Sequence, residues 1–217
     1  MKNLLSRSLC SLGATLLLAF VAPAVSGADL AVYSAQPSGS SVKIDGTSTI
    51  HNWTVEGKII GGKFEIDPAF AIAGTPAAGK VNAKAKASIP VRSLKSGKPR
   101  MDEVMQEHMK MTDFPRIEYE LTELSLKEAP KSATDPLVFD SQGKLTISGV
   151  SNTRAMTVKC DRSEAGKLKF SGVVDLKMTD FGIKPPAPSL ALGLVKTGDD
   201  IKVTIEWVTA QKADAPK

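Results

Sequence analysis

Between Lys80 and Ile89 the chain alternates strictly between polar and apolar residues. A period of two puts successive side chains on opposite faces of the backbone, so this segment predicts a β-strand with one solvated and one apolar face. The apolar face contains Ala83, Ala85 and Ala87, which fill little volume where a closely packed interior would favour larger side chains. We therefore expect the strands of this protein to enclose some space.

Similar alternation recurs along the chain and predicts further strands, most of them bounded by Gly, Pro, Asn, Asp or Ser. The expected strands are Ser41–Asp45, Thr49–Lys58, Gly62–Asp67, Lys80–Pro90, Arg116–Leu126, Lys144–Gly149, Thr153–Arg162, Lys167–Met178 and Asp200–Thr209. Their connections are mostly short, which favours antiparallel neighbours over a parallel sheet.

One segment departs from this period. From Pro99 to Lys110 the apolar residues recur at helical spacing, with acidic residues on the opposite side. Proline suits the first helical turn, and the terminal lysine complements the helix dipole. The pattern predicts a short amphipathic helix packed over one end of the β-structure.

Together these patterns predict an all-β fold, an extended antiparallel barrel of about eight strands with one short helical insert. Closure removes exposed sheet edges, and a barrel of about eight strands is wide enough to hold one small ligand. No familiar catalytic motif interrupts the strands. The sequence therefore indicates a binding protein rather than an enzyme.

The N-terminus has the pattern of a secretory signal peptide. Lys2 and Arg7 give a positive start, residues 9–21 are mainly apolar, and small residues follow. We expect cleavage between Ala24 and Ala28, and a periplasmic or secreted protein. The apolar run is shorter than the ~20 residues that a transmembrane helix needs, so we expect no integral membrane span in the mature protein.

The rest of the chain is expected to form one domain. The expected organisation is a signal peptide over 1–27, a mobile lead-in over 28–40, the barrel over 41–209 and a disordered tail over 210–217. Loss of Lys2 and Arg7 lowers the formal net charge from +5 to +3, and the remaining excess is spread along the chain. We therefore expect no nucleic-acid partner. The oligomeric state is left open.

The mature chain keeps one cysteine, Cys160, and so cannot form an internal disulfide. This residue alternates with Met156 and Val158, which favours a buried small hydrophobe. A reactive thiol or an intermolecular bridge is the alternative.

Several short motifs occur in a fixed order along this domain. They are Gly46–Trp53 followed by Gly61–Phe64, Ile89–Gly97 followed by Met101–Asp102 and Phe114–Ile117, then Gly143–Val150 and Met178–Pro186. Over roughly residues 42–208 this ordered series resembles the YceI-like family. The resemblance implies a lipocalin-like barrel whose tunnel binds a polyisoprenoid chain, usually in the bacterial periplasm. It also implies a carrier or binding protein without a shared catalytic apparatus.

A polyisoprenoid is a long branched hydrocarbon, so its site should be an apolar tube. Small side chains would leave volume, bulkier ones would supply the wall, and flexible thioethers would adapt to an irregular lipid. Ordinary core packing is the alternative for each residue taken alone. The candidate tunnel residues are Val81, Ala83, Ala85, Ala87, Met101, Met105, Met109, Phe170, Val174, Leu176, Val203 and Ile205.

If the ligand carries a phosphate or pyrophosphate head, the tunnel mouth should be basic. Several cations surround a glycine-containing loop, where paired donors could hold phosphate oxygens; a solvated loop with scattered charge is the alternative. His51 and Trp53 share a strand face and could either contact ligand or belong to the core and rim. The candidate mouth residues are His51, Trp53, Arg92, Lys95 and Arg100, with Lys98 beside them. A lid or rim is expected from Pro185, Pro186, Leu190, Leu192, Leu194 and Val195.

Three other functions remain open: copper binding, catalysis, and a purely structural or partner-binding barrel, which a filled interior would distinguish. Copper(I) favours soft ligands such as those of Met101, Met105, His108, Met109 and Met111, with Cys160 as a further candidate, although a packing face explains the same stripe. An enzyme would need a positioned acid, base or nucleophile, and the chain has only two histidines. We expect binding, sequestration or transport of an apolar isoprenoid-type lipid, without catalysis, metal or cofactor. The identity of the lipid is left open.

Overall fold

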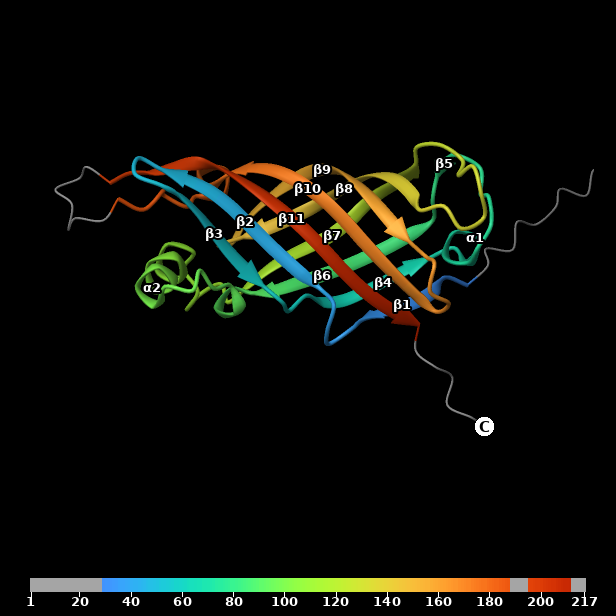
Figure 1. Cartoon of the computed structure of the whole chain (residues 1–217), viewed down its shortest axis with the longest axis horizontal. Helices are drawn as coiled ribbons and strands as arrows, with labels where there is room; N and C mark the ends of the chain where they lie inside the picture. The colour runs from blue at the N-terminus through green and yellow to red at the C-terminus, as the bar shows by residue number, and fades with distance from the viewer. Residues whose placement is uncertain (1–28, 188–194, 212–217) are drawn as a thin grey trace, which may run out of the picture.

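Eleven β-strands form one antiparallel sheet in residues 29–187 and 195–211, which the computed structural model describes (Figure 1). The strands are β1 (Ala31–Ala35), β2 (Ser41–Ser48), β3 (Asn52–Gly57), β4 (Gly61–Ile66), β5 (Gly79–Lys80), β6 (Ala83–Pro90), β7 (Arg116–Leu126), β8 (Leu137–Ile147), β9 (Val150–Asp161), β10 (Lys167–Lys177) and β11 (Thr197–Gln211). The helices are α1 (Pro68–Ala71), α2 (Pro99–His108) and the 3₁₀ turns η1 (Val91–Ser93) and η2 (Met178–Phe181).

The sheet closes on itself through its first and last strands. The order β1-β4-β6-β7-β8-β9-β10-β11 is completed by pairing of β1 with β11, which makes a closed ring of eight strands in the described part of the chain. β11 is long enough to pair with β1 near its C-terminal end and with β2 over Ile201–Glu206. The predicted all-β antiparallel barrel of about eight strands with one short helical insert is therefore confirmed.

The two ends of the barrel differ (Figure 1). α1 and β5 lie at one end, together with the β7–β8 connection, and α2 lies at the other. α2 begins at Pro99, as its spacing predicts, and ends at His108, two residues before the expected Lys110. Among residues 29–187 and 195–211, no helix is long and apolar enough to cross a membrane.

The α1 end is packed solid. Leu126, Leu137 and Leu168 are almost fully buried there, and Cys160 beside them is a free cysteine that is 1% exposed. Burial raises the pKa of the Cys160 thiol to about 12. This confirms the interpretation of Cys160 as a small buried hydrophobe.

A buried arginine joins the loops at this end. Arg162 is only 5% exposed, and its guanidinium donates hydrogen bonds to the backbone carbonyls of Ile72, Gly74 and Ala133. Burial lowers the pKa of the Arg162 guanidinium. The three acceptors come from the α1–β5 and β7–β8 connections, so one side chain holds both loops over the end of the barrel.

Part of the expected mobile lead-in is ordered. Residues 31–35 form β1, and Tyr33 is 2% exposed between β4 and β11. The prediction of a mobile 28–40 segment is wrong for this strand, because its pairing with both neighbours closes the barrel. The expected signal peptide over 1–27 lies outside the described residues.

Other boundaries also differ from the predictions. The expected strand Lys80–Pro90 is two strands, because the backbone leaves the ladder between β5 and β6 and the Val81 N–H donates to the Leu124 carbonyl. β8 begins seven residues before the expected Lys144, and β11 includes Ala210 and Gln211 of the expected tail. The remainder of the tail, residues 212–217, lies outside the described residues.

Replacing Arg162 tests whether the loop contacts stabilise the closed end. We expect Arg162→Met to lower the free energy of unfolding by about 2–3 kcal/mol, because three backbone carbonyls of the two loops lose a buried charged donor. Urea denaturation of both proteins measures the difference. The exposed Arg92 of η1 provides the matched control, and Arg92→Met should change stability by less than about 0.5 kcal/mol. Equal urea midpoints for the two variants would contradict this role of Arg162.

Candidate functional site

The barrel encloses a cavity of about 830 Å³. It is lined by α2 and by side chains from β2, β3, β4 and β6 to β11, so almost every wall of the barrel contributes. Volumes of roughly 300–1,000 Å³ are typical of sites that enclose a small-molecule ligand. Most lining side chains are aliphatic, aromatic or methionine. The cavity therefore suits an apolar molecule.

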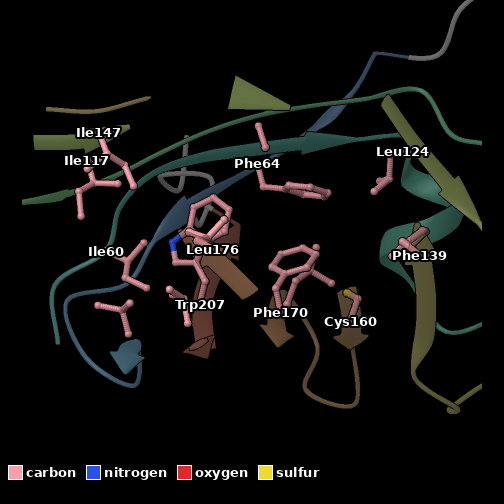
Figure 2. Packing of buried hydrophobic residues seen from close by; sticks show 14 of the residues in the cluster. Ile60, Phe64, Ile117, Leu124, Phe139, Ile147, Cys160, Phe170, Leu176 and Trp207 are labelled. Atoms are coloured by element: carbon pink, nitrogen blue, oxygen red, sulfur yellow. The ribbon is translucent and has the colours of Figure 1, made fainter. Parts of the chain in front are cut away.

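Three aromatic side chains line the cavity and pack against one another (Figure 2). The ring centroids of Phe64 and Phe170 lie 4.5 Å apart, and that of Trp207 lies 6.5 Å and 5.8 Å from them. Leu124 and Phe139 line the cavity on the side of these rings that leads to the closed end. This part of the cavity is thus apolar, and Leu124 and Phe139 lie between it and the packed α1 end.

Glycines keep two aromatic side chains against the wall. A Cβ atom at Gly143 would lie 2.3 Å from the Tyr119 ring, and one at Gly46 would lie 2.1 Å from the Trp53 ring. Each ring occupies the place where a cross-strand side chain would otherwise stand. The rings therefore lie along the sheet rather than across the interior, and space remains.

Tyr119 is the main polar group on this wall. It forms a side-chain hydrogen bond with Ser141, whose hydroxyl also donates to the Met156 carbonyl at 2.8 Å. Burial raises the pKa of Tyr119, and the contact with Ser141 only partly opposes that change. The phenol is therefore neutral at physiological pH and contributes no charge to the cavity.

Towards the α2 end, the wall between β9 and β10 is no longer held by direct pairing of the two strands. Direct pairing of these strands covers Lys169–Gly172 of β10, and η2 bridges them beyond that point. There Asn152 Nδ2 donates to the Asp180 carbonyl at 2.7 Å, and the Arg154 guanidinium pairs with the Asp180 carboxylate at 2.5 Å. Arg154 also lies over the Phe181 ring, 5.4 Å from its centroid. Side chains rather than backbone ladder complete this part of the wall.

The mouth of the cavity lies at the α2 end. Here the imidazole Nδ1 of His108 lies 2.8 Å from the Lys184 carbonyl oxygen, which joins α2 to the segment after η2. Among the described residues, the charged side chains that line the cavity are Lys98, Arg100, Glu107, Arg154 and Lys184. They lie on α2 or directly before it, near the start of β9, and in the segment after η2. Charge is thus confined to the mouth, and the interior is apolar.

Most of the predicted tunnel residues line this cavity. Those that do are Ala85, Ala87, Met101, Met105, Met109, Phe170, Val174, Leu176, Val203 and Ile205. Val81 and Ala83 do not, because the interruption after β5 puts them at the packed α1 end. Lining residues that were not singled out include Ile44, Tyr119, Leu145 and Val158. Strand alternation is the signal that could have identified them.

Only some of the predicted mouth residues line the cavity. His51, Trp53 and Arg100 line the cavity, whereas Arg92 and Lys95 do not. Arg92 is exposed on η1, and the Lys95 ammonium lies 3.8 Å from the Asp102 carboxylate. Of the expected basic cluster around the glycine loop, Lys98 and Arg100 therefore line the cavity, and Arg92 and Lys95 do not.

The contact of Lys95 with Asp102 explains why Lys95 does not line the cavity. The Asp102 carboxylate accepts hydrogen bonds from the Ser96 backbone N–H and hydroxyl, at 2.7 Å and 2.6 Å. Burial raises the pKa of Asp102, but these bonds and the nearby Lys95 outweigh it and lower the pKa overall. Lys95 therefore serves to fix the loop before α2.

Of the expected lid, Pro185, Pro186 and Val195 line the cavity, while Leu190, Leu192 and Leu194 lie outside the described residues.

Of the methionines considered as copper ligands, Met101, Met105 and Met109 line the cavity, but Met111 does not. Among residues 29–187 and 195–211, no group of three or more His, Cys, Asp or Glu side chains could hold a metal ion.

Comparison with known proteins agrees with this architecture. A family model of the YceI-like domain matches residues 33–209. The fold is similar to a polyisoprenoid binding domain from Saccharophagus degradans implicated in plant cell wall breakdown, with a TM-score of 0.63, 13% identity, and coverage of 84% of this chain and 99% of that one. It is also similar to BcnA of Burkholderia cenocepacia, with a TM-score of 0.58, 19% identity, and coverage of 78% and 95%.

A third similar structure is the YCEI protein of Campylobacter jejuni, with a TM-score of 0.52, 21% identity, and coverage of 74% of this chain and 85% of that one. No functionally curated protein matches the chain. The match of the family model over most of the barrel shows that the chain belongs to the YceI-like domain family.

Proposed function

We propose that this protein binds an apolar isoprenoid-type lipid inside its barrel, in order to sequester or carry it, and that no catalytic step is involved. The observation that carries the proposal is the cavity of about 830 Å³ with an apolar interior and with its charges confined to the mouth. The likeness to a polyisoprenoid binding domain supports the same class of ligand.

Burial of hydrocarbon is sufficient to drive such binding. Each five-carbon unit contributes up to about 3–4 kcal/mol of transfer free energy, at ~0.8 kcal/mol per buried carbon group. Association and ordering of the chain oppose part of this gain, so several buried units give useful affinity. The methionines of α2 lie where the lipid would pass into the barrel, and their flexible thioethers suit a branched chain.

We further propose that the protein works in the periplasm or after secretion. The positive start and apolar run of residues 1–27 support a cleaved signal peptide. A lipid that passes between membranes through water needs such an enclosed carrier, because water rejects its hydrocarbon.

The first test is the content of the purified protein. Protein purified without detergent should release an apolar molecule into organic solvent, and mass spectrometry should show masses that differ by five-carbon units. The flow-through of the same column provides the background. Extracts that repeatedly contain no more lipid than that background would argue against a carrier.

The second test fills the cavity. Ala87 of β6 lines it, and an indole at this position would project into an interior only a few side chains wide. We expect Ala87→Trp to reduce the lipid recovered per protein at least about fivefold while the barrel remains folded, since the added apolar group enters empty space rather than a packed core.

The matched control adds the same group to the outside of the barrel. Ala155 of β9 is exposed, and Ala155→Trp should retain the lipid content of the unmodified protein. Far-ultraviolet circular dichroism of both variants checks the fold. Equal lipid recovery from the two variants would show that the lipid does not lie within the barrel.

A further inference from the structure

The rim of the cavity mouth carries apolar side chains that face solvent. Ile50, in the turn between β2 and β3, is 66% exposed, and Phe114 and Val150 are also exposed large hydrophobic residues. The β2–β3 turn lies at the same end of the barrel as α2 (Figure 1), and its Ser48 and His51 line the cavity. The described residues that line the cavity include none of the three apolar ones. Ile50, Phe114 and Val150 thus surround the opening without belonging to the interior.

Phe114 and Val150 are held together beside the end of α2. A Cβ atom at Gly149 would lie 2.5 Å from the Phe114 ring, and Val150 is the next residue along the chain. The Ser148 hydroxyl donates to the Met109 carbonyl at 2.9 Å, and Met109 lines the cavity. The turn between β8 and β9 therefore fixes both apolar side chains at the mouth.

An exposed lysine accompanies each of these apolar sites. The Thr49 N–H, next to Ile50, donates to the Lys196 carbonyl at 3.0 Å. The Phe114 N–H donates to the Lys110 carbonyl at 2.8 Å. Apolar and cationic side chains are thus neighbours on both turns.

Positive charge predominates among the unpaired side chains at this end. Ion pairs such as those of Arg100 with Glu103 and Arg154 with Asp180 are neutral as pairs. Two exposed carboxylates, Glu107 and Asp113, oppose the lysines only in part. The exposed lysines without an ion-pair partner among the described residues are Lys98, Lys110, Lys184 and Lys196. The mouth therefore presents apolar side chains together with an excess of cations.

The opposite end has an equally exposed apolar residue in a different setting. Ile72 follows α1 and is 63% exposed, but its carbonyl accepts a hydrogen bond from Arg162 in the loops over the closed end. Exposure alone therefore does not distinguish the two ends. Their difference is that the α2 end combines apolar and cationic side chains around the opening of the cavity.

We propose that the α2 end docks on the surface of a membrane that contains anionic lipids, with Ile50, Phe114 and Val150 at the boundary of headgroups and acyl chains and the lysines beside the phosphates. This inference rests on the proposed lipid-binding function and names the surface with which the protein exchanges its lipid. Apolar side chains next to cations are the combination that binds membrane interfaces. Docking sets the cavity mouth against the bilayer, so a hydrocarbon chain passes between the two without entering water.

Sedimentation with vesicles tests the docking directly. The protein is mixed with sucrose-loaded vesicles of phosphatidylglycerol and phosphatidylcholine in equal parts, or of phosphatidylcholine alone, and the bound fraction is measured after centrifugation. We expect the affinity for the anionic vesicles to be at least about tenfold higher, because lysines near an anionic surface are attracted to it. Added salt should reduce this difference, because it screens the exposed charges.

Two isoleucines of nearly equal exposure assign the docking to one end. Ile50→Asp should lower the affinity for the anionic vesicles at least about tenfold, since a carboxylate replaces an apolar side chain at the interface. Ile72→Asp makes the same chemical change at the far end, and it should lower the affinity less than about twofold, because its charge lies far from the surface. Neither side chain lines the cavity, so both variants should retain the lipid content of the unmodified protein.

The outcomes separate this inference from the proposed function. Equal vesicle affinities of the two variants would overturn the docking, as would equal affinities of the unmodified protein for the two kinds of vesicle. A dimer in analytical ultracentrifugation that Ile50→Asp dissociates would identify the face as a contact between two copies, and it would overturn the docking as well. None of these results concerns the lipid inside the barrel. Protein that contains no extractable lipid, yet binds anionic vesicles through Ile50, would contradict the carrier and support only the docking.

Discussion

The pairing of β1 with β11 is the contact on which the rest of this structure depends. Three residue pairs, Tyr33 with Gln211, Ser34 with Ala210 and Ala35 with Thr209, join the first described strand to the last. Without them the sheet would be open, and β1 would be an edge strand with unpaired backbone groups. With them the backbone ladder runs around the whole ring, so the interior can contain space and the barrel still holds its shape.

The two ends of the barrel differ in role: the α1 end provides stability, and the α2 end contains the mouth of the cavity. The α1 end is a packed core, in which buried leucines and the loop contacts of Arg162 provide stability. The α2 end is held by weaker polar contacts, such as that of His108 with the Lys184 carbonyl and that of Arg154 with Asp180. Because such contacts are partly solvated, they can separate at lower cost than the packed end. This asymmetry gives the cavity one mouth.

The sequence predicted well which side of each strand is apolar. It predicted less well which strands and side chains lie next to one another. β7 was predicted with its observed bounds, because its alternation is clean and Pro115 precedes it. β1 was missed, because a strand of five residues between Ser-, Gly- and Pro-containing stretches is ordered mainly by its partners. Arg92 and Lys95 were expected at the mouth because they are close in sequence to Arg100, but only Arg100 lines the cavity.

Other features depend on cross-strand contacts that no single strand reveals. The alternation of β11 puts Trp207 on its apolar side, yet the unpaired N–H of its indole becomes apparent only when every neighbouring acceptor is placed. The contact of Tyr119 with Gly143 likewise joins two strands whose register the sequence does not specify. Patterns along the chain therefore predict the wall of the barrel, whereas the chemistry of its interior follows from the register.

At Gly143 the absence of a side chain leaves room for the Tyr119 ring against the wall and so keeps the interior of the barrel open. Because the Tyr119 ring fills the place of a Cβ at Gly143, a single methyl group there would force the phenol out of its present position. A phenol displaced into the lumen would narrow it without any change in strand pairing. Relatives with the same ladder could thus differ in the length of chain that they admit through a substitution of one residue.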